Sequence, residues 1–230
     1  MPGKDGSLRR IYTNQQHTTN AFLDDYGFTA SAFIKLYQVT FNKHWLSLAK
    51  QITDYAIANF YDSKSGMFYY SNAPSSNLIA AKMEVSDNAM PSSNATMAGV
   101  LYKLAVYFDN KDYNEKSRKM LSVISPRMFE QPAFYSNWCY LAGLFSHGSY
   151  EVAIMGKEAL SKNIELQKNY LPSCIYMGET VEENLPLLEE KLIANKTMIY
   201  VCSNKVCRLP VENVSKAVIQ VKKNFEKIKN

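Results

Sequence analysis

Two short polar segments carry the side chains that could do chemistry, and each precedes an apolar stretch with helical spacing. The first is Leu23–Tyr26 and the second is Asp87–Asn94. Glycosidases use a pair of carboxyl groups, one protonated as an acid and one ionised as a base or nucleophile. We therefore take Asp24, Asp25 and Asp87 as candidate catalytic residues.

Polar side chains around these aspartates could hydrogen-bond the hydroxyl groups of a sugar-like ligand. The candidate ligand-binding residues are Tyr26, Glu84, Ser92, Ser93 and Asn94. Capping is the alternative role, because Ser, Asn and Asp are favoured at helix N-caps and acids interact well with the positive end of a helix. Both roles remain open from the sequence.

The elements that position these residues are predicted to be helices in the first two thirds of the chain. The spacing predicts helices over 24–41, 44–60, 93–108, 113–124 and 134–145, with Ser125-Pro126 ending the fourth. Residues 1–20 are predicted to be an irregular lead-in, and Met67–Tyr70 is predicted to pair with Leu78–Ala81 as a hairpin. The predicted buried positions are Leu46, Ala49, Ile52, Ala56 and Phe60 on the second helix, and Phe28, Ala32, Phe33, Leu36, Tyr37 and Thr40 on the first.

An internal repeat relates the two polar segments. Aligning Asp24-Asp25-Tyr26 with Ser92-Ser93-Asn94 also aligns Asn42-Lys43 with Asn110-Lys111. The repeated unit is a pair of antiparallel helices, and stacked helical hairpins build solenoids or closed α/α toroids. We predict a mainly α fold: a partial (α/α)6 toroid of helical hairpins over residues 1–148.

The character of the chain changes after Gly148. Strands are predicted at Tyr150–Met155, Ser173–Met177 and Thr197–Cys202, and helices at Glu158–Tyr170, Glu182–Lys191 and Val211–Lys229. This alternation predicts a small C-terminal α/β element with a parallel sheet over residues 149–230. No glycine-rich phosphate loop follows any of these strands, so the sequence does not support a mononucleotide site.

Composition limits the partners we expect. The chain has 230 residues, a net charge of +5 and scattered basic residues. The basic run from Lys216 to Lys229 is typical of a solvated helix face, so we expect no nucleic acid partner. No apolar run reaches membrane-spanning length and the first residues lack a signal-peptide core, so we expect a cytoplasmic protein with no membrane partner.

The four cysteines are too few and too dispersed for a disulfide scaffold. Cys202 and Cys207 lack the further ligands of a zinc site, so we expect no metal and no cofactor. We expect Cys202 to be a buried thiol, with a reversible disulfide to Cys207 as the alternative.

Three motifs, in order, resemble those of one known family. Phe22–Phe28 resembles an LDDYAF signature, Asp87–Asn94 resembles D-x-A-x-P-S-G-N-S, and Tyr200–Cys202 with Cys207–Pro210 resembles YVC…C-x-P. Together they resemble the C-terminal part of the spermatogenesis-associated, thioredoxin-like family, the YyaL-type proteins, and the resemblance covers nearly the whole chain. Ser93 and Ala95 depart from the family pattern, which usually has Gly and often has Ser at these positions.

The resemblance implies an N-terminal thioredoxin-like domain followed by an (α/α)6 toroid similar to N-acylglucosamine 2-epimerases and six-hairpin glycosidases. Since this chain has five predicted toroid helices and no thioredoxin segment, we expect a C-terminal fragment or a truncated product. The family's activity is not established, so the resemblance implies a fold more than a function. From the candidate residues we expect binding or processing of a carbohydrate-like ligand, by glycosidase- or epimerase-like chemistry if it is an enzyme. An epimerase would need histidine bases, and of His17, His44 and His147 only His17 lies close to Asp24 in the sequence.

Two alternatives to a ligand-processing function remain. The chain could be a non-catalytic interaction module that accompanies a thioredoxin-like domain, or an inactive fragment. Missing hairpins would leave apolar helix faces exposed, so we also expect a homodimer through an open helical edge.

Overall fold

A computed structural model describes residues 3–13, 16–72, 82–180 and 185–227. The chain divides into two compact units. Unit 1 comprises Met1–Lys35, Lys43–Ala105 and Asn110–Gly143, and unit 2 comprises Leu36–Asn42, Val106–Asp109 and Leu144–Asn230. The prediction of a mainly α fold with a small α/β element is confirmed.

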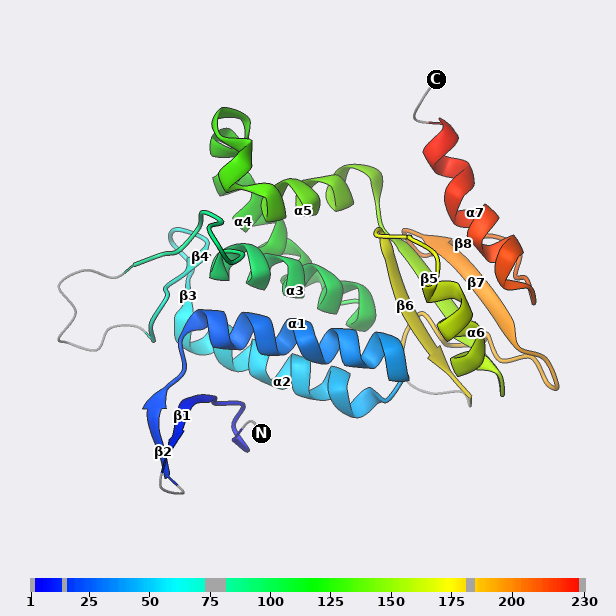
Figure 1. The fold of residues 1–230 in the computed structure, drawn as a ribbon, viewed down its shortest axis with the longest axis horizontal. Helices are drawn as coiled ribbons and strands as arrows, with labels where there is room; N and C mark the ends of the chain where they lie inside the picture. Colours follow the sequence, from blue (N-terminus) through cyan, green and yellow to red (C-terminus); the bar gives the residue numbers. More distant parts are fainter. Residues whose placement is uncertain (1–2, 14–15, 73–81, 181–184, 228–230) are drawn as a thin grey trace. The chain divides into compact units, whose positions relative to one another are not determined.

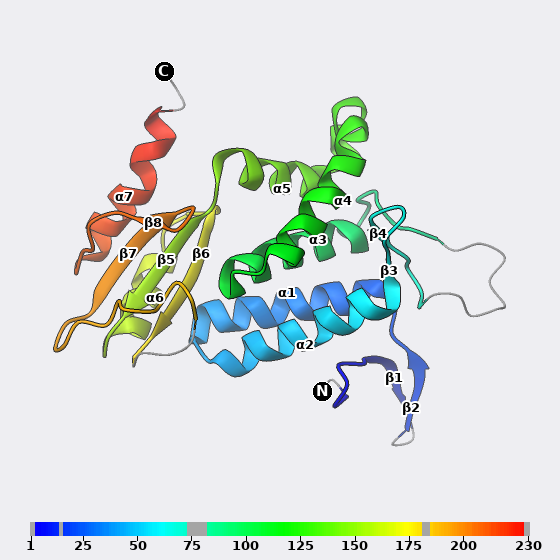
Figure 2. The same ribbon diagram turned by 180° about the vertical axis from the view of Figure 1, so that it is seen from behind.

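Helical hairpins make up most of unit 1, and the ends of three of their helices (residues 36–40, 106–108 and 144–147) belong to unit 2. The helices are α1 (Leu23–Thr40), α2 (Lys43–Phe60), α3 (Ser93–Phe108), α4 (Lys111–Glu130) and α5 (Ser136–His147), with a 3-10 turn at Pro132–Phe134. Helices α1 and α2 run antiparallel side by side (Figure 1), and Figure 2 shows the same hairpin from behind. Gly27 allows α1 to approach α3 closely, because a Cβ atom there would lie 3.2 Å from Cγ2 of Thr96.

The structure supports the predicted repeat at the turns between paired helices. Phe41 follows α1 with a φ of 55° and Asp109 follows α3 with a φ of 50°, both in the left-handed region. An asparagine comes next in each case, and Asn110 caps α4 by accepting a hydrogen bond from the backbone N–H of Tyr113. The same Asn-Lys turn therefore closes both hairpins.

The predicted buried face is confirmed for α2 and wrong for α1. Leu46, Ala49, Ile52, Ala56 and Phe60 are all buried. On α1 Tyr37 is buried as predicted, but Leu36 is 40% exposed and the other buried apolar residues lie on a different stripe, formed by Leu23, Tyr26, Ala30 and Ile34. Apolar residues surround α1 on several sides, so their spacing alone does not select the face that packs.

The predicted end of α4 at Ser125-Pro126 is wrong. The helix continues through Pro126 to Glu130. Pro126 has no N–H to give to the carbonyl oxygen of Ser122, but the Ser125 hydroxyl donates to that oxygen at 3.1 Å. The lost backbone hydrogen bond is thus replaced by a side chain, which lowers the cost of proline inside the helix.

Two small hairpins differ from the predictions. Residues 9–20 are not irregular: β1 (Arg9–Thr13) pairs antiparallel with β2 (Gln16–Asn20). Their threonines, together with Ile11 and Tyr12, are residues that favour strands. β4 (Met67–Phe68) pairs with β3 (Tyr61–Asp62), whereas the predicted partner at 78–81 lies outside the described residues.

Unit 2 contains a four-stranded sheet in the order β6-β5-β7-β8. The strands are β5 (Tyr150–Met155), β6 (Cys174–Glu179), β7 (Met198–Ser203) and β8 (Val206–Cys207). β5 and β6 are parallel, but β7 runs antiparallel to β5, so the prediction of a parallel sheet is only partly right.

The described part of the connection between β6 and β7 bears on the reversed strand. Within the described part of the predicted helix Glu182–Lys191, residues 186–190 form turns rather than a helix. Pro186 disfavours a helical Leu185, and Glu190 has a φ of 57°. A parallel β7 would need a crossover connection back to the other edge of the sheet, whereas the antiparallel β7 begins at the edge where β6 ends.

Helices α6 (Ala159–Gln167) and α7 (Val214–Lys227) pack beside each other against the sheet (Figure 1). Alternate strand residues such as Val152, Ile154 and Val201 meet them and form the core of this unit. Among the described residues, no helix has the length and apolar character needed to cross a membrane.

Candidate functional site

The predicted site residues of unit 1 lie at the starts of two helices. Asp24, Asp25 and Tyr26 are in the first turn of α1, and Ser93 and Asn94 are the first residues of α3. Ser92, Glu84 and Asp87 belong to the loop that leads into α3.

Asp87 is held on both oxygens by neighbouring segments. Its Oδ1 accepts the backbone N–H of Ser92 at 2.9 Å. Its Oδ2 accepts the backbone N–H of Asn137 at 2.9 Å and the hydroxyl of Ser136 at 3.3 Å. Asp87 is only 7% exposed. The carboxylate therefore connects the start of α3 to the start of α5.

Ser92, Ser93 and Asn94 serve the local fold. The Ser92 hydroxyl accepts the backbone N–H of Ala95 at 3.0 Å and caps α3. Asn94 is fully buried and bridges three backbone groups: its Oδ1 accepts the N–H of Phe68, and its Nδ2 donates to the carbonyl oxygens of Phe68 and Glu84. The Ser93 hydroxyl is buried without a hydrogen-bond partner in the described residues.

The start of α1 carries a polar and aromatic group that we call the Arg10 cluster: Arg10, Phe22, Asp24, Asp25 and Tyr70. Arg10 lies 3.6 Å from Oδ2 of Asp24 and 3.8 Å from Oδ2 of Asp25. Its guanidinium lies 5.0 Å from the ring centre of Phe22, and hydrogen bonding with Tyr70 raises the pKa of Arg10. The Tyr70 hydroxyl donates to Oδ2 of Asp24 at 3.1 Å.

Asp25 and Tyr26 both accept backbone N–H groups, and only Asp25 does so at the start of its own helix. Oδ2 of Asp25 accepts the backbone N–H of Phe22 at 2.9 Å. The Tyr26 hydroxyl accepts the backbone N–H of Leu8 at 2.9 Å, and burial raises the pKa of Tyr26 to about 12. Tyr26 therefore fixes the chain before β1 rather than facing solvent.

Lys82 joins the Arg10 cluster to the α3 loop. Its Nζ lies 5.5 Å from the ring centre of Tyr70 and 3.7 Å from Oε1 of Glu84. Oε2 of Glu84 in turn accepts the backbone N–H of Ser93 at 3.4 Å. A chain of contacts thus connects the two predicted helix starts within unit 1.

Sequence reasoning missed Arg10, Phe22, Tyr70 and Lys82. Arg10 lies in a segment predicted to be irregular, and Tyr70 in a hairpin predicted with a different partner. Phe22 was noted only as part of a motif, no element was predicted at Lys82, and no spacing pattern connects these residues to Asp24. Among the described residues, no group of three His, Cys, Asp or Glu side chains could hold a metal ion.

Unit 2 holds a disulfide where a buried thiol was expected. Cys202 on β7 is bonded to Cys207 on β8, so the thiol prediction is wrong and the disulfide alternative holds. The two residues are opposite each other in the antiparallel hairpin, and this pairing brings the sulfur atoms together. The separation in sequence does not reveal it, because the tight Asn204-Lys205 turn is what sets the register.

Glu151 is a buried carboxyl group beside this hairpin. It lies opposite Cys202 on β5 and is 5% exposed. Its Oε2 accepts the backbone N–H of Lys205 at 3.3 Å. Burial raises the pKa of Glu151, and the hydrogen bonds from the turn oppose this shift only in part.

Several known proteins are similar to this chain, although no family model matches it. Spermatogenesis-associated protein 20 from Homo sapiens is 24% identical over 223 residues, which cover 89% of this chain and 28% of that protein. The protein of the same name from Mus musculus is 23% identical over 202 residues, covering 83% and 26%. An uncharacterized protein of Caenorhabditis elegans is 22% identical over 215 residues, covering 90% and 29%.

The chain therefore spans less than a third of the length of the curated relatives it matches. These similarities support the family resemblance that the three motifs indicate. Among solved structures, a polysaccharide lyase has a TM-score of 0.35 and 18% identity, covering 46% of this chain and 31% of the lyase.

The raised pKa of Glu151 predicts how stability depends on pH. A folded state that binds the proton more tightly than the unfolded chain loses stability as pH rises from the ordinary glutamate value through the raised one. In urea unfolding at a series of pH values, Glu151→Gln should remove this loss and be more stable than the wild type at neutral pH. The exposed Glu165→Gln variant is the control and should follow the wild-type curve. Identical pH profiles for Glu151→Gln and the wild type would contradict the assignment.

Proposed function

We propose that this chain binds a carbohydrate-like ligand at the exposed side of the Arg10 cluster. The observation that carries the proposal is the stacked pair of Phe22 and Tyr70, whose ring centres are 5.1 Å apart at an interplanar angle of 11°. Cationic groups lie over both rings, Arg10 over Phe22 and Lys82 over Tyr70.

Such a surface has the chemistry that a sugar requires. The two rings cover each other and lie beneath the cationic groups, so the aromatic pair would hold the polar side chains in place, and these side chains would orient the hydroxyl groups of the sugar. The side chains of Arg10 and Lys82 are 39% and 68% exposed, and that of Glu84 is 32% exposed. Two cationic donors and one carboxylate acceptor are therefore partly exposed to solvent beside the stacked pair.

The proposal is for binding rather than hydrolysis. Glycosidases place two carboxyl groups on opposite sides of the bond that breaks. Asp24 and Asp25 both lie against the same guanidinium of Arg10, and Asp87 is buried and already accepts three hydrogen bonds. Freeing Asp87 for an acid–base role would break the connection between α3 and α5.

The sequence similarities support placing this chain in the family of spermatogenesis-associated protein 20. In a partial toroid of that family we expect a ligand to bind near the N-terminal ends of α1 and α3, because a polar loop precedes each of these helices. This inference rests on the motifs and the similarity together.

The Cys202–Cys207 disulfide favours a second candidate function, as an interaction module for a thioredoxin-like domain. Cys207 is partly exposed whereas Cys202 is 1% exposed, so an incoming thiolate would attack Sγ of Cys207. Cys202 would leave as a thiolate and take up a proton. The second thiol of the partner would then resolve the mixed disulfide, leaving the partner oxidised and both cysteines reduced.

Carbohydrate binding can be tested by titrating mono- and oligosaccharides into the 15N-labelled chain and following the NMR signals. We expect Lys82→Gln to raise the dissociation constant by roughly threefold to tenfold, the range for loss of a polar or cation–π contact. Lys50→Gln is a matched control, because Lys50 also lies over a tyrosine ring, that of Tyr113. No binding by the wild type, or equal effects of the two substitutions, would refute the site.

The second function can be tested with a reduced thioredoxin-type protein and mass spectrometry after alkylation. Cys202 and Cys207 should gain two labels, and mutating the partner's second thiol should trap a mixed disulfide at Cys207. Cys174 is an internal control for unfolding, because burial raises its pKa to about 12 and it should stay unlabelled. An unchanged disulfide under conditions in which the partner reduces an exposed test disulfide would count against this function.

A further inference from the structure

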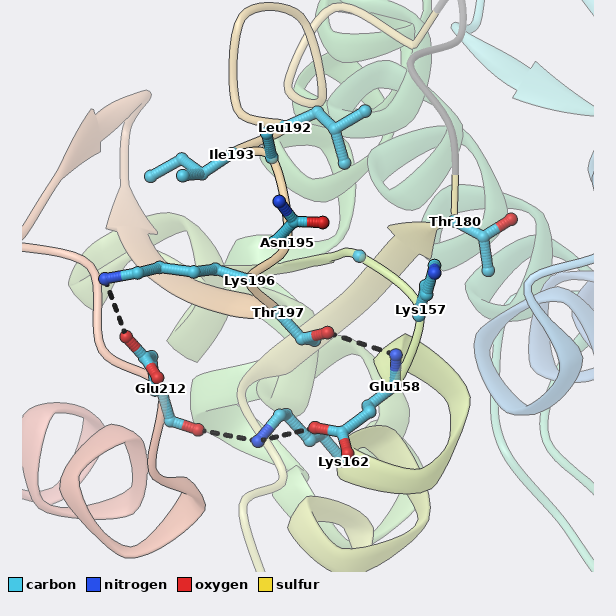
Figure 3. A pocket seen from close by; sticks show the side chains of 12 residues that line it. Lys157, Glu158, Lys162, Thr180, Leu192, Ile193, Asn195, Lys196, Thr197 and Glu212 are labelled. Carbon is cyan, nitrogen blue, oxygen red and sulfur yellow. Dashed lines mark hydrogen bonds and ion pairs between the residues drawn. The ribbon is translucent and has the colours of Figure 1, made fainter.

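A pocket of ≈ 480 Å³ lies within unit 2, at one edge of its sheet (Figure 3). It is formed where β5 and β6 end and where β7 begins, and the approach to α7 closes one side. We propose that this pocket binds a small phosphorylated molecule, with the phosphate group held by Lys157 together with Thr180 and Asn195. This site is separate from the carbohydrate-binding function proposed for unit 1.

The topology of the sheet places the pocket where ligands commonly bind. In open α/β sheets ligands bind in the crevice beyond the carboxyl ends of the strands. This crevice lies where the strand order reverses, so that successive connections lead to opposite sides of one strand. Here the chain leaves β5 to form β6 on one side and then forms β7 on the other side of β5. The pocket lies at this change of direction.

The floor of the pocket is closely packed. Gly156 has a φ of 126°, and a Cβ atom there would lie 2.4 Å from the carbonyl oxygen of Lys196 and 2.7 Å from Oγ1 of Thr197. The backbone N–H of Glu158 also donates to Oγ1 of Thr197 at 3.1 Å. The turn after β5 therefore packs directly on the segment before β7, and the pocket exists before any ligand arrives, as is usual for small-molecule sites.

Charge in the pocket leaves one lysine for a ligand. Lys162 lies 3.5 Å from Oε2 of Glu158 and donates to the carbonyl oxygen of Glu212 at 2.9 Å. Lys196 lies 3.3 Å from Oε1 of Glu212. These contacts neutralise both glutamates and brace the walls (Figure 3). No described carboxylate lies within ion-pair distance of the third lysine, Lys157.

The remaining side chains suit a phosphate ester better than a free anion. Lys157 and Thr180 lie on one side of the opening, and Asn195 lies across from them beside Leu192 (Figure 3). Lysine is a common phosphate ligand, and hydroxyl and amide groups add hydrogen bonds to phosphate oxygens. Leu192 and Ile193 are 39% and 41% exposed and form an apolar wall for the body of the molecule.

The proposal is tested by calorimetric titration of the full chain at low ionic strength. The probes are inorganic phosphate, glucose 6-phosphate, adenosine 5′-monophosphate and unphosphorylated glucose. We expect at least one ester to bind more tightly than inorganic phosphate, and glucose to leave this pocket unoccupied. Which ester binds distinguishes a sugar phosphate from a nucleotide.

Two variants, each lacking one lysine charge, distinguish binding in the pocket from general electrostatic attraction of the anion to the protein. Lys157→Gln should raise the dissociation constant of the ester about tenfold, the expected effect of losing a charged hydrogen bond. Lys168→Gln changes an exposed lysine of the same unit outside the pocket and should change it less than about twofold.

Three results would overturn the proposal: no phosphorylated probe binds, both variants weaken binding equally, or Lys157→Gln has no effect. An ester that binds no better than inorganic phosphate would refute the role of the apolar wall. Glucose binding that responds to Lys82→Gln but not to Lys157→Gln would belong to the Arg10 cluster, so the two sites fail independently.

Discussion

The buried carboxylate of Asp87 is the contact on which the helical unit depends. It accepts backbone N–H groups from the start of α3 and from the start of α5, and it is almost inaccessible to water. Asn94, in the first turn of α3, connects the same loop to β4 through the backbone of Phe68 and Glu84. Buried polar groups are costly unless they are paired, so these two side chains fix the geometry of three segments at once.

This constraint separates structural polar residues from those available to a ligand. Asp87, Ser92 and Asn94 use their polar atoms within the fold, whereas Arg10, Lys82 and Glu84 keep part of theirs in solvent. Glu84 and Lys82 connect the loop before α3 to the Arg10 cluster through partly exposed contacts. Unit 2 shows the same division between structural and available groups. Lys162 and Lys196 form ion pairs with glutamates in the wall of the pocket, whereas no described carboxylate forms an ion pair with Lys157.

Hydrophobic periodicity predicted most of the fold. The sequence predicted helices α2 and α3 and strands β5 to β7, because the spacing of their apolar residues matches one helix or strand type. It also predicted the Asn-Lys turns, because these residues interrupt the apolar spacing at the same place in both halves of the repeat. The buried face of α1 could not be read in this way, since apolar residues occur on several of its sides. The course of α4 depended on a single hydroxyl, that of Ser125, which compensates for Pro126.

The site was harder to predict than the fold. The sequence located the polar helix starts at Asp24 and Asp87, and capping was already the alternative role for them. It could not reveal Arg10 or Tyr70, because their contacts with Asp24 join segments that are distant in the chain. Long-range pairings of this kind, like that of Glu151 with Cys202, depend on strand register and leave no local pattern.

The central claim is that Asp87 stabilises the fold and does not bind the ligand. Its most direct test measures urea unfolding and saccharide binding on the same Asp87→Ala variant. The free energy of unfolding should fall by about 2–4 kcal/mol, because the buried N–H of Ser92 and the partly buried N–H of Asn137 lose their carboxylate acceptor. Asp112→Ala, which removes a carboxylate that is 62% exposed, should cost no more than about 1 kcal/mol. The folded Asp87→Ala variant should bind saccharides as the wild type does. Unchanged stability together with lost binding would contradict the account.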